Sequence, residues 1–520
     1  MVGAAAIIGI GNVASRILGL ARETIIAYLF GATGYVSVFR VAATLIQTLY
    51  DFLVGGMVSA ALVPVFSDFA SRENKEDLWR VASVVINVLA VALASAVLVL
   101  EIFAPQLVWI LGSGYDPALQ DAAVQMVRLV LPAVFFLGMS GVVTGLLYSL
   151  KRFAYPAFTT AVYNLGIVAV ALALSPFFGI TSLILGIIVG SALQVGLQLP
   201  GLRDMHYRFA IDFSHPALRK ILRLYAPVVA GLSIMVVGVA IDRNLASHTG
   251  DQSLAWMQDA TTLTQLPLGL VATAISFAIL PELSRQSPVP SLQSSVASSQ
   301  TTSNLQSPTS KFQQTLAFGI KLVLLLIIPA AVGLFVLAHP IVGLLFEHGA
   351  FTANDTLMTS TALRFYLIGL PFAAIDQPLV FAFYSRKNTL APNLVAFAGV
   401  AIYIAVALAL VQSLGMIGLV IANSAQLTGH ALIMLWLTQT RLGGLGRQGV
   451  VALLAKSLLA SAAMGAIAFV ALGALGHASH LWQVIVPAAA AGAVYVVLLR
   501  LLRVREAERA WQIVWSRVRR

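Results

Sequence analysis

Cysteine and charge are the two things that this sequence lacks most. None of its 520 residues is a cysteine, which excludes disulfides and thiolate metal sites. Charged residues make up only 10% of the chain, whereas a soluble domain needs roughly 25% to cover a surface that faces water. The sequence also has no HExxH metal motif, no GxSxG nucleophile motif and no phosphate-binding GxxxxGKS or GxxxxGKT loop. We therefore expect neither a soluble protein nor an enzyme, and no cofactor is implied.

Apolar sequence is what the chain has in abundance. Hydrophobic residues make up 59% of it, and its mean hydropathy is +0.92. An α-helix needs about 20 apolar residues to cross the hydrocarbon core of a bilayer. Fourteen stretches meet this requirement, at residues 4–30, 36–65, 79–104, 120–149, 156–175, 181–200, 219–247, 252–281, 313–338, 356–384, 391–411, 416–438, 450–473 and 482–502. Strands of a membrane barrel would be about 10 residues long and strictly alternating. The sequence therefore predicts an all-α polytopic membrane protein with about 14 transmembrane helices.

The basic residues predict how the chain is oriented. Loops after the even-numbered stretches and the C-terminal tail hold Lys and Arg, whereas loops after the odd-numbered stretches hold none. Cytoplasmic loops carry an excess of Lys and Arg, so both termini are predicted to be cytoplasmic. The net charge of +11 thus lies next to lipid head groups and not on a nucleic-acid-binding face. We expect membrane lipids, and no nucleic acid, as partners.

An internal repeat divides the chain. Residues 148–174 resemble residues 384–410 at a spacing of 236, and LVPVFS at 62–67 more weakly resembles ILPELS at 279–284, at a spacing of 217. Both matches map stretches 1–6 onto 7–12 in the same orientation, which is the plan of a two-lobed transporter with a binding cavity between its lobes. The predicted domains are a six-helix lobe at 1–203, a cytoplasmic linker at 204–218, a second six-helix lobe at 219–440, two extra helices at 441–503 and a basic cytoplasmic tail at 504–520. Polar low-complexity residues 286–310 are predicted to be a flexible cytoplasmic insertion within the second lobe.

Two arginines and a glutamate stand inside the first apolar stretch. A charge near the bilayer centre costs about 2.5–3.5 kcal/mol, so it needs a partner or a wet cavity. Arg16 and Glu23 fall on nearly the same helical face, and Arg22 points about 120° away. Two interpretations stay open. The residues either form ion pairs that hold helices together, or they line the cavity and bind an anionic group. Phosphate is such a group, and arginine binds it through paired hydrogen bonds.

Other charged residues within the stretches are candidates for the same cavity. Arg40 and Arg364 are predicted to line it, with an interfacial position as the alternative for Arg40. Asp51 and Asp376 are the deepest isolated acids, and either could neutralise an arginine or bind a proton or cation. Asp242 is a second candidate for cation coupling, with a local ion pair to the adjacent arginine as its alternative.

Several motifs, in order along stretches 1 to 11, resemble the MurJ/MviN family of lipid II flippases. SRILGLARE at residues 15–23 resembles the signature of the family's first helix. The most specific matches are PLGL at 267–270, LPELSR at 280–285 and LFEHGAFT at 345–352. FYSRK at 383–387, and PAF at 156–158 with Asn164, add to them. The family belongs to the multidrug/oligosaccharidyl-lipid/polysaccharide exporter superfamily, most other members of which have twelve helices.

The resemblance implies a flippase. It would move lipid II, the undecaprenyl-pyrophosphate-linked peptidoglycan precursor, from the inner to the outer leaflet of the bacterial cytoplasmic membrane by alternating access. Arg16 and Arg22 fall on first-helix arginines of the family, which implies that they bind the pyrophosphate. The extra helix pair implies a groove for the lipid tail, and Asp242 a site for a coupling cation. Cell-wall synthesis proteins are implied as possible partners.

The chain also departs from the family pattern. Charges that many members carry in the second helix and before the PLGL motif are replaced by uncharged residues, namely Ser37, Thr44, Tyr50 and Ala260-Thr261-Thr262. Two alternatives to lipid II transport therefore remain open. One is export of another polyprenyl-linked glycan, and the other is a cell-wall synthesis scaffold that transports nothing.

Overall fold

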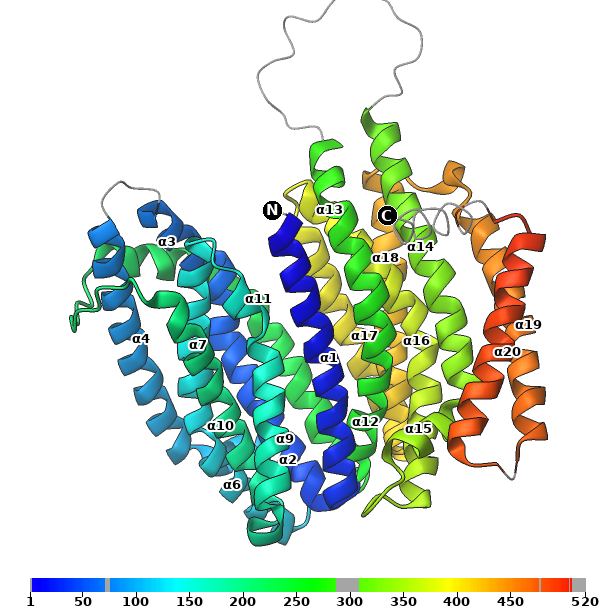
Figure 1. The fold of residues 1–520 in the computed structure, drawn as a ribbon, viewed down its shortest axis with the longest axis horizontal. Helices are drawn as coiled ribbons and strands as arrows, with labels where there is room; N and C mark the ends of the chain where they lie inside the picture. Colours follow the sequence, from blue (N-terminus) through cyan, green and yellow to red (C-terminus); the bar gives the residue numbers. More distant parts are fainter. Residues whose placement is uncertain (1, 71–74, 287–307, 477, 505, 507–520) are drawn as a thin grey trace, which may run out of the picture. The chain divides into compact units, whose positions relative to one another are not determined.

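The computed structural model describes residues 2–70, 75–286, 308–476, 478–504 and 506. These residues form helices joined by short loops, with no β-strand among them (Figure 1). Thirteen helical segments are long and apolar enough to cross a membrane, and each overlaps one of the predicted stretches 2 to 14. The first predicted stretch is helix α1 (Val2–Phe30), which has 29 residues but carries three charges. The structure thus confirms the all-α polytopic membrane fold.

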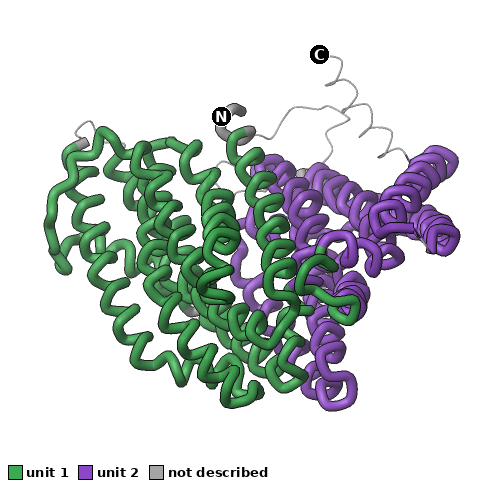
Figure 2. Tube along the Cα trace, turned by 60° about the horizontal axis from the view of Figure 1, so that its bottom comes forward, with its two compact units in different colours: residues 1–258, 346–355 green, residues 259–345, 356–520 purple. Residues whose placement is uncertain are grey.

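The helices group into two compact units, residues 1–258 with 346–355 and residues 259–345 with 356–520 (Figure 2). The first unit holds α1, α2 (Gly34–Tyr50), α3 (Val63–Ala70), α4 (Lys75–Ile102), α5 (Ala104–Gly112), α6 (Pro117–Val130), α7 (Pro132–Ser149), α8 (Ala154–Ala157), α9 (Thr159–Phe178), α10 (Thr181–Gln198) and α11 (Pro216–Ser247). The second holds α13 (Ala274–Gln286), α14 (Pro308–Val336), α15 (Ala338–Phe346), α17 (Leu390–Leu414), α18 (Met416–Arg441), α19 (Val450–Ala474) and α20 (His480–Leu501). Helices α12 (Ser253–Pro267) and α16 (Ala353–Ser385) run from one unit into the other.

The compact units do not coincide with the predicted lobes. Helix α11, which follows the predicted linker, packs on α5 and belongs to the first unit. The boundaries of the predicted domains therefore stay predictions. The predicted insertion at 286–310 and the basic tail at 504–520 lie mostly outside the described residues.

The loops between predicted stretches hold more helix than their hydropathy indicates. Helix α5 follows stretch 3 and α15 follows stretch 9, both within segments predicted to be loops. The predicted stretch at 120–149 is divided into α6 and α7. The division falls at Pro132, because proline has no N–H to donate and its ring clashes with the preceding turn.

The turn after α7 recurs after α16. Lys151 and Lys387 both adopt a left-handed backbone, with φ of 59° and 58°. In each turn the next N–H donates to the carbonyl oxygen five residues earlier, which is the bond of a Schellman motif. Gly179 and Gly415, with φ of 53° and 54°, end α9 and α17, and the N–H of each donates to the carbonyl oxygen four residues earlier. Both pairs are 236 residues apart, so the local structure repeats at the spacing of the sequence match.

Two membrane spans contain π-helical turns at matching places. In the span at 34–70 these are η1 (Asp51–Gly55) and η2 (Val58–Leu62), and in the span at 253–286 it is η4 (Leu268–Thr273). The first residues of η1 and η4 are 217 apart, which is the spacing of the weaker sequence match. A π turn inserts an extra residue into a helix, and such turns are frequent at functional sites.

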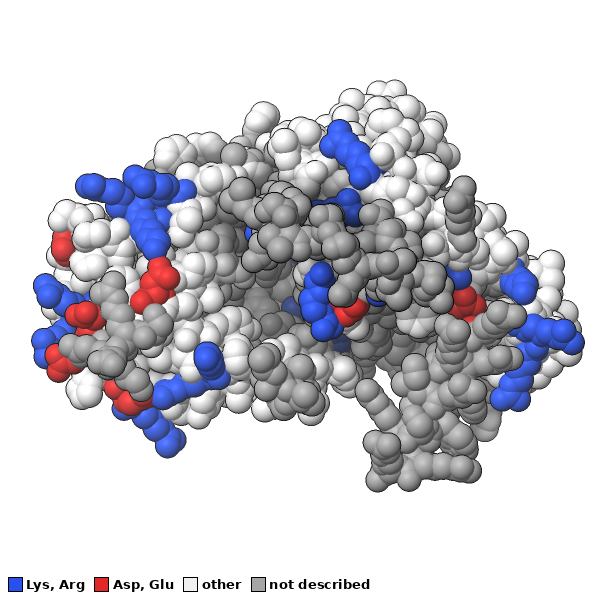
Figure 3. All heavy atoms as spheres, turned by 90° about the horizontal axis from the view of Figure 1, so that it is seen from above, with Lys and Arg blue, Asp and Glu red and all other residues white. Residues whose placement is uncertain are grey.

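Basic side chains gather at one end of the helices. Figure 3 views the end at which α13 finishes and α14 begins, and Lys and Arg side chains lie on this face. Two lysines within spans also reach toward a helix end in the second unit. Lys321 pairs with Glu506 at 2.8 Å, and Lys456 donates to the carbonyl oxygen of Leu502. Both contacts keep the ammonium group at the end of the helices, as long basic side chains in membranes do.

The repeated glycine turns give a stability prediction. Gly179 and Gly415 have no atom within 4 Å of an added Cβ, so Gly179→Ala and Gly415→Ala should act through backbone strain alone and cost about 1–3 kcal/mol each. Gly473→Ala is the control, because Gly473 lies in open space within α19 at an ordinary helical φ, where alanine should be neutral or stabilising. Thermal unfolding of the purified protein in detergent measures all three. Equal unfolding temperatures for Gly415→Ala and Gly473→Ala would contradict the strain argument.

Candidate functional site

The carboxylate of Glu23 lies at the centre of a charged cluster in the first unit. Glu23, on α1, is 1% exposed and forms salt bridges with its neighbour Arg22 and with Arg40 on α2. Arg22 Nε donates to Glu23 Oε1 at 3.0 Å. Arg22 Nη1 also donates, at 3.0 Å, to Oδ1 of Asn164 on α9, and α9 packs directly on α1 (Figure 1). The cluster therefore joins three helices.

The arginines of the cluster differ in how accessible they are. The Arg40 side chain is 6% exposed, whereas that of Arg22 is 26% exposed. Arg40 thus neutralises Glu23 inside the packed unit, and part of the Arg22 side chain stays accessible. Arg16, six residues earlier on α1, is also only partly buried. Three arginines and one glutamate leave a net charge of +2 among these four residues.

Small residues bring α1 close to its neighbours. A Cβ on Gly11 would collide with the carbonyl oxygen of Ala157 in α8, and a Cβ on Gly19 would lie 3.6 Å from Nδ2 of Asn164. Small residues on packing faces let transmembrane helices approach closely. Asn164 donates from Nδ2 to the carbonyl oxygen of Ser15 at 3.2 Å, while its Oδ1 accepts from Arg22. Asn164 therefore fixes both the backbone of α1 and the guanidinium that the helix presents.

Asp51 lies apart from this cluster, at the first position of the π turn η1. Both of its carboxylate oxygens accept from Gln47 Nε2 at 3.2 Å. The hydroxyl of Tyr225, on α11, donates to the carbonyl oxygen of Phe52 in the same turn. Asp51 therefore has a local amide partner, and the structure does not show it neutralising Arg16 or Arg22.

Ser37 is an uncharged residue at a position where the family pattern has a charge. It is buried, and its hydroxyl oxygen accepts a hydrogen bond from the N–H of Ala255.

The other predicted site residues have partners of their own. Asp242 pairs with the adjacent Arg243 at 3.3 Å in the first unit, and its role in cation coupling stays a prediction. In the second unit Arg364 Nε donates to the carbonyl oxygen of Phe335 at 3.3 Å. Asp376, on α16, accepts a 2.9 Å hydrogen bond from His430 on α18. Among the described residues no three His, Asp or Glu side chains are placed to hold a metal ion.

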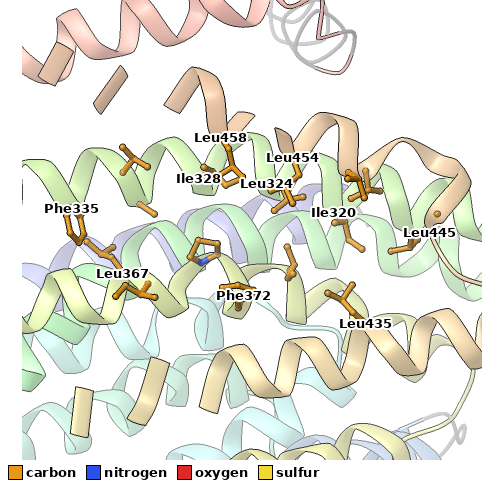
Figure 4. Close-up of a pocket in the computed structure, with 18 of the residues that line it drawn as sticks. Ile320, Leu324, Ile328, Phe335, Leu367, Phe372, Leu435, Leu445, Leu454 and Leu458 are labelled. Atoms are coloured by element: carbon orange, nitrogen blue, oxygen red, sulfur yellow. The ribbon is translucent and has the colours of Figure 1, made fainter. Parts of the chain in front are cut away.

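An apolar cavity of about 640 Å³ lies within the second unit. Its walls come from α14, α16, α18, the segment after α18, and α19, and Gln439 is the only polar side chain among the lining residues. Figure 4 shows Leu324 and Ile328 of α14, Leu367 and Phe372 of α16, and Leu458 of α19 around the same space.

Helix α19 supplies one wall of this cavity, and α19 and α20 are both bound to α14. Tyr495, on α20, donates its hydroxyl to the carbonyl oxygen of Leu325 at 2.7 Å, and its oxygen lies 3.1 Å from Oγ of Ser457 on α19. Gly465 of α19 faces Val332 of α14, where a Cβ would approach within 2.7 Å. The extra helix pair is thus held by polar contacts and close packing, and α19 supplies one wall of the cavity.

Solved structures define the class of protein. The chain is similar to one described as "Lipid II flippase MurJ, inward closed conformation", with a TM-score of 0.79 and 24% identity over 95% of this chain and 98% of that one. It is also similar to an inward-facing multidrug resistance MATE family transporter of the MOP superfamily, with a TM-score of 0.64, 14% identity, and coverage of 83% and 96%. The fold is therefore the one that these membrane transporters share.

The sequence identifies the family within that class. The family model described as "Lipid II flippase MurJ" matches residues 26–489, and the chain belongs to this family. The lipid II flippase MurJ of Burkholderia cenocepacia is 29% identical over 392 residues, 74% of this chain and 73% of that protein. The probable lipid II flippase MurJ of Rhizobium tropici is 28% identical over 488 residues, 92% of this chain and 86% of that protein.

Sequence reasoning identified the charges but not all of their partners. Arg22 and Glu23 were predicted together, whereas the position of Arg40 against Glu23 depends on how α2 packs on α1. Asn164 stood in a family motif without a role, and His430 was not a predicted site residue. The available signal for His430 was that it is the only histidine in its apolar stretch, where an ionisable group needs a partner.

The charged cluster gives a second stability prediction. Glu23→Gln should lower the free energy of unfolding by about 3–5 kcal/mol, because it leaves two arginines without their buried counter-charge. Glu282→Gln, in the exposed pair with Arg285 (side chains 43% and 77% exposed), is the control and should cost about 0–1 kcal/mol. Detergent-solubilised unfolding curves measure both. If the two variants lose the same stability, Glu23 does not hold the cluster together.

Proposed function

We propose that this protein flips lipid II, the undecaprenyl-pyrophosphate-linked peptidoglycan precursor, from the inner to the outer leaflet of the bacterial cytoplasmic membrane. Membership of the lipid II flippase MurJ family across residues 26–489 carries this proposal. The chain's own chemistry supports it in two places, the arginine cluster of the first unit and the apolar cavity of the second.

The arginine cluster suits a pyrophosphate. Guanidinium groups bind phosphate oxygens through paired, charge-assisted hydrogen bonds. Arg22 is held by Asn164 and Glu23 yet keeps a quarter of its side chain exposed, and Arg16 is partly exposed on the same helix. We assign head-group binding to Arg16 and Arg22. The buried Glu23, itself paired with Arg40, holds the guanidinium of Arg22.

The apolar cavity suits a polyprenyl chain. A flexible hydrocarbon tail gains stability where its surface leaves water. Apart from Gln439, the described lining residues are apolar or glycine, so most of the cavity wall sets no polar group against such a tail. The tail would occupy the space between α14, α16 and α19 while the head group crosses the membrane.

Transport of this kind makes and breaks no covalent bond. By analogy with the inward-facing and outward-facing conformations named for similar MATE family transporters, the protein would alternate between states open to either side of the membrane. The basic loops support a cytoplasmic location for both termini. Asp51, Asp242 and Arg364 remain proposed cavity or coupling residues, and cell-wall synthesis proteins remain proposed partners.

Loss of either exposed arginine should abolish function. In bacteria depleted of their own lipid II flippase, the unaltered protein should restore growth, whereas Arg16→Ala and Arg22→Ala should not, because a head group that loses a charge-assisted contact binds more weakly by about 1.5–3 kcal/mol per contact. Arg128→Ala is the matched control, since Arg128 is an exposed arginine of α6 in the same unit, and it should rescue normally.

Translocation of lipid II by purified protein in proteoliposomes separates the alternatives. Movement of lipid II excludes a scaffold that transports nothing. Movement of another polyprenyl-linked glycan with no movement of lipid II would replace the proposed substrate. Normal rescue by both arginine variants at normal protein levels would remove Arg16 and Arg22 from the head-group site.

The cavity gives a separate prediction about the lipid tail. Leu458→Trp places a larger side chain in the cavity, and overpacking costs about 1–3 kcal/mol. Translocation of full-length lipid II should therefore fall at least about fivefold. A short-chain analogue should be affected less. Leu459→Trp is the control, because Leu459 is 64% exposed and is not among the lining residues. Equal effects of Leu458→Trp on both substrates would place the tail elsewhere.

A further inference from the structure

The Asp376–His430 pair is an ionisable pair inside the membrane-spanning part of the second unit. His430 Nδ1 lies 2.9 Å from Asp376 Oδ1. His430 stands 14 residues after the first and 11 before the last residue of α18 (Met416–Arg441). At about 1.5 Å per residue it is roughly 16 Å from the helix end, near the middle of a hydrocarbon core about 30 Å thick.

No other full charge is placed to neutralise this pair within its own helices. Helices α16, α17 and α18 carry few other titratable residues, namely Asp355, Arg364, Tyr366, Tyr384, Tyr403 and Arg441. Arg364 is 12 residues from Asp376, about 18 Å along the helix, and donates to the Phe335 carbonyl oxygen. From α14 and α19, Lys321 and Lys456 are directed to Glu506 and the Leu502 carbonyl oxygen. Tyr384 and Tyr403 are uncharged near neutral pH. Helix α13, which meets α16 through Phe277 and Phe381, carries Glu282 and Arg285, and these two pair with each other in its last turns.

The geometry shows where a proton would bind. An ionised carboxylate only accepts hydrogen bonds, so the imidazole nitrogen facing Asp376, Nδ1, carries the hydrogen. Nε2 then holds the lone pair, and an incoming proton binds there. The side chains are 17% and 20% exposed, so the pair is not sealed from its surroundings. Imidazole is the side chain whose ordinary titration falls between pH 5 and 8.

The pair also connects two walls of the apolar cavity. Two nearby residues line that cavity: Ile375, next to Asp376 on α16, and Leu435, five residues after His430 on α18. The same two helices meet where Ser424 Oγ donates to the Phe365 carbonyl oxygen at 2.7 Å. An imidazolium attracts a carboxylate more strongly than a neutral imidazole does, so protonation would tighten α16 on α18.

We propose that Asp376 and His430 form a proton-binding site that couples lipid movement to the pH gradient across the membrane. Binding of one proton at His430 sets the packing of α16 on α18, and with it the cavity that takes the lipid tail. This proposal rests on the proposed flippase function. It assigns the coupling ion to this pair, while Asp242, with Arg243 beside it, serves a local ion pair.

Transport under an imposed gradient is the first test. Fluorescent lipid II is followed in proteoliposomes with the membrane potential clamped, with and without a gradient of one pH unit. One coupled proton can change the rate by up to about tenfold, because one pH unit is worth about 1.4 kcal/mol per proton. The unaltered protein should respond to the gradient, and His430→Gln and Asp376→Asn should have a ratio of rates near one. His248→Gln should keep the full response, because His248 lies in the first unit, where its Nδ1 is 2.9 Å from the Asn244 carbonyl oxygen and its ring lies beside Gly114.

A second measurement does not need lipid II. Thermal unfolding of the purified full-length protein is recorded at about pH 5.5 and pH 8, on either side of ordinary histidine titration. The unfolding temperature of the unaltered protein should be higher than that of His430→Gln, and the gap should be larger at pH 5.5 than at pH 8. When both proteins also carry Asp376→Asn, the gap should no longer depend on pH.

The two measurements separate the proposals. An equal stability difference at both pH values overturns the proton site, whatever happens to lipid II. Lipid II movement that ignores the gradient, or a normal gradient response in both variants, overturns the coupling while leaving the flippase function intact. No lipid II movement together with the expected pH-dependent stability refutes the flippase function and the coupling, but supports proton binding by the pair.

Discussion

The first unit depends on the burial of one carboxylate between two guanidinium groups. Arg40 at 5% exposure and Glu23 at 1% exposure would each be a costly isolated charge within the membrane. Together they form an ion pair that joins α1 to α2. Because Arg40 already neutralises the charge of Glu23, the more exposed Arg22 gives the cluster a net positive charge. One interaction therefore serves both packing and the chemistry of the site.

The two units use different chemistry. The first presents arginines fixed by an amide and a carboxylate, and the second presents a large apolar cavity beside an acid–histidine pair. An amphiphilic lipid with an anionic head and a long hydrocarbon tail requires both kinds of surface. The repeated turns at Lys151 and Lys387 show that the two halves of the chain share local backbone structure. The functional side chains differ between the halves.

The membrane spans could be predicted from the sequence because long apolar runs are a strong signal. Helices α5 and α15 were missed, since hydropathy does not distinguish a short helix from a loop beside the membrane. The presence of charges on α1 predicted that partners must exist. Their identity could not be predicted, because Arg40 reaches Glu23, and His430 reaches Asp376, only through the packing of one helix on another. Sequence spacing along a single helix carries no information about that packing.

Every residue that lines the apolar cavity belongs to one compact unit. Its walls on α14 and α19 are also linked through Tyr495 and Ser457. A molecule bound in this cavity would therefore contact one unit only and would move with it. A rigid-body movement of the unit would leave the walls of the site unchanged, so only a change of packing within the unit, such as that of α16 on α18, would alter the length of hydrocarbon chain that it holds.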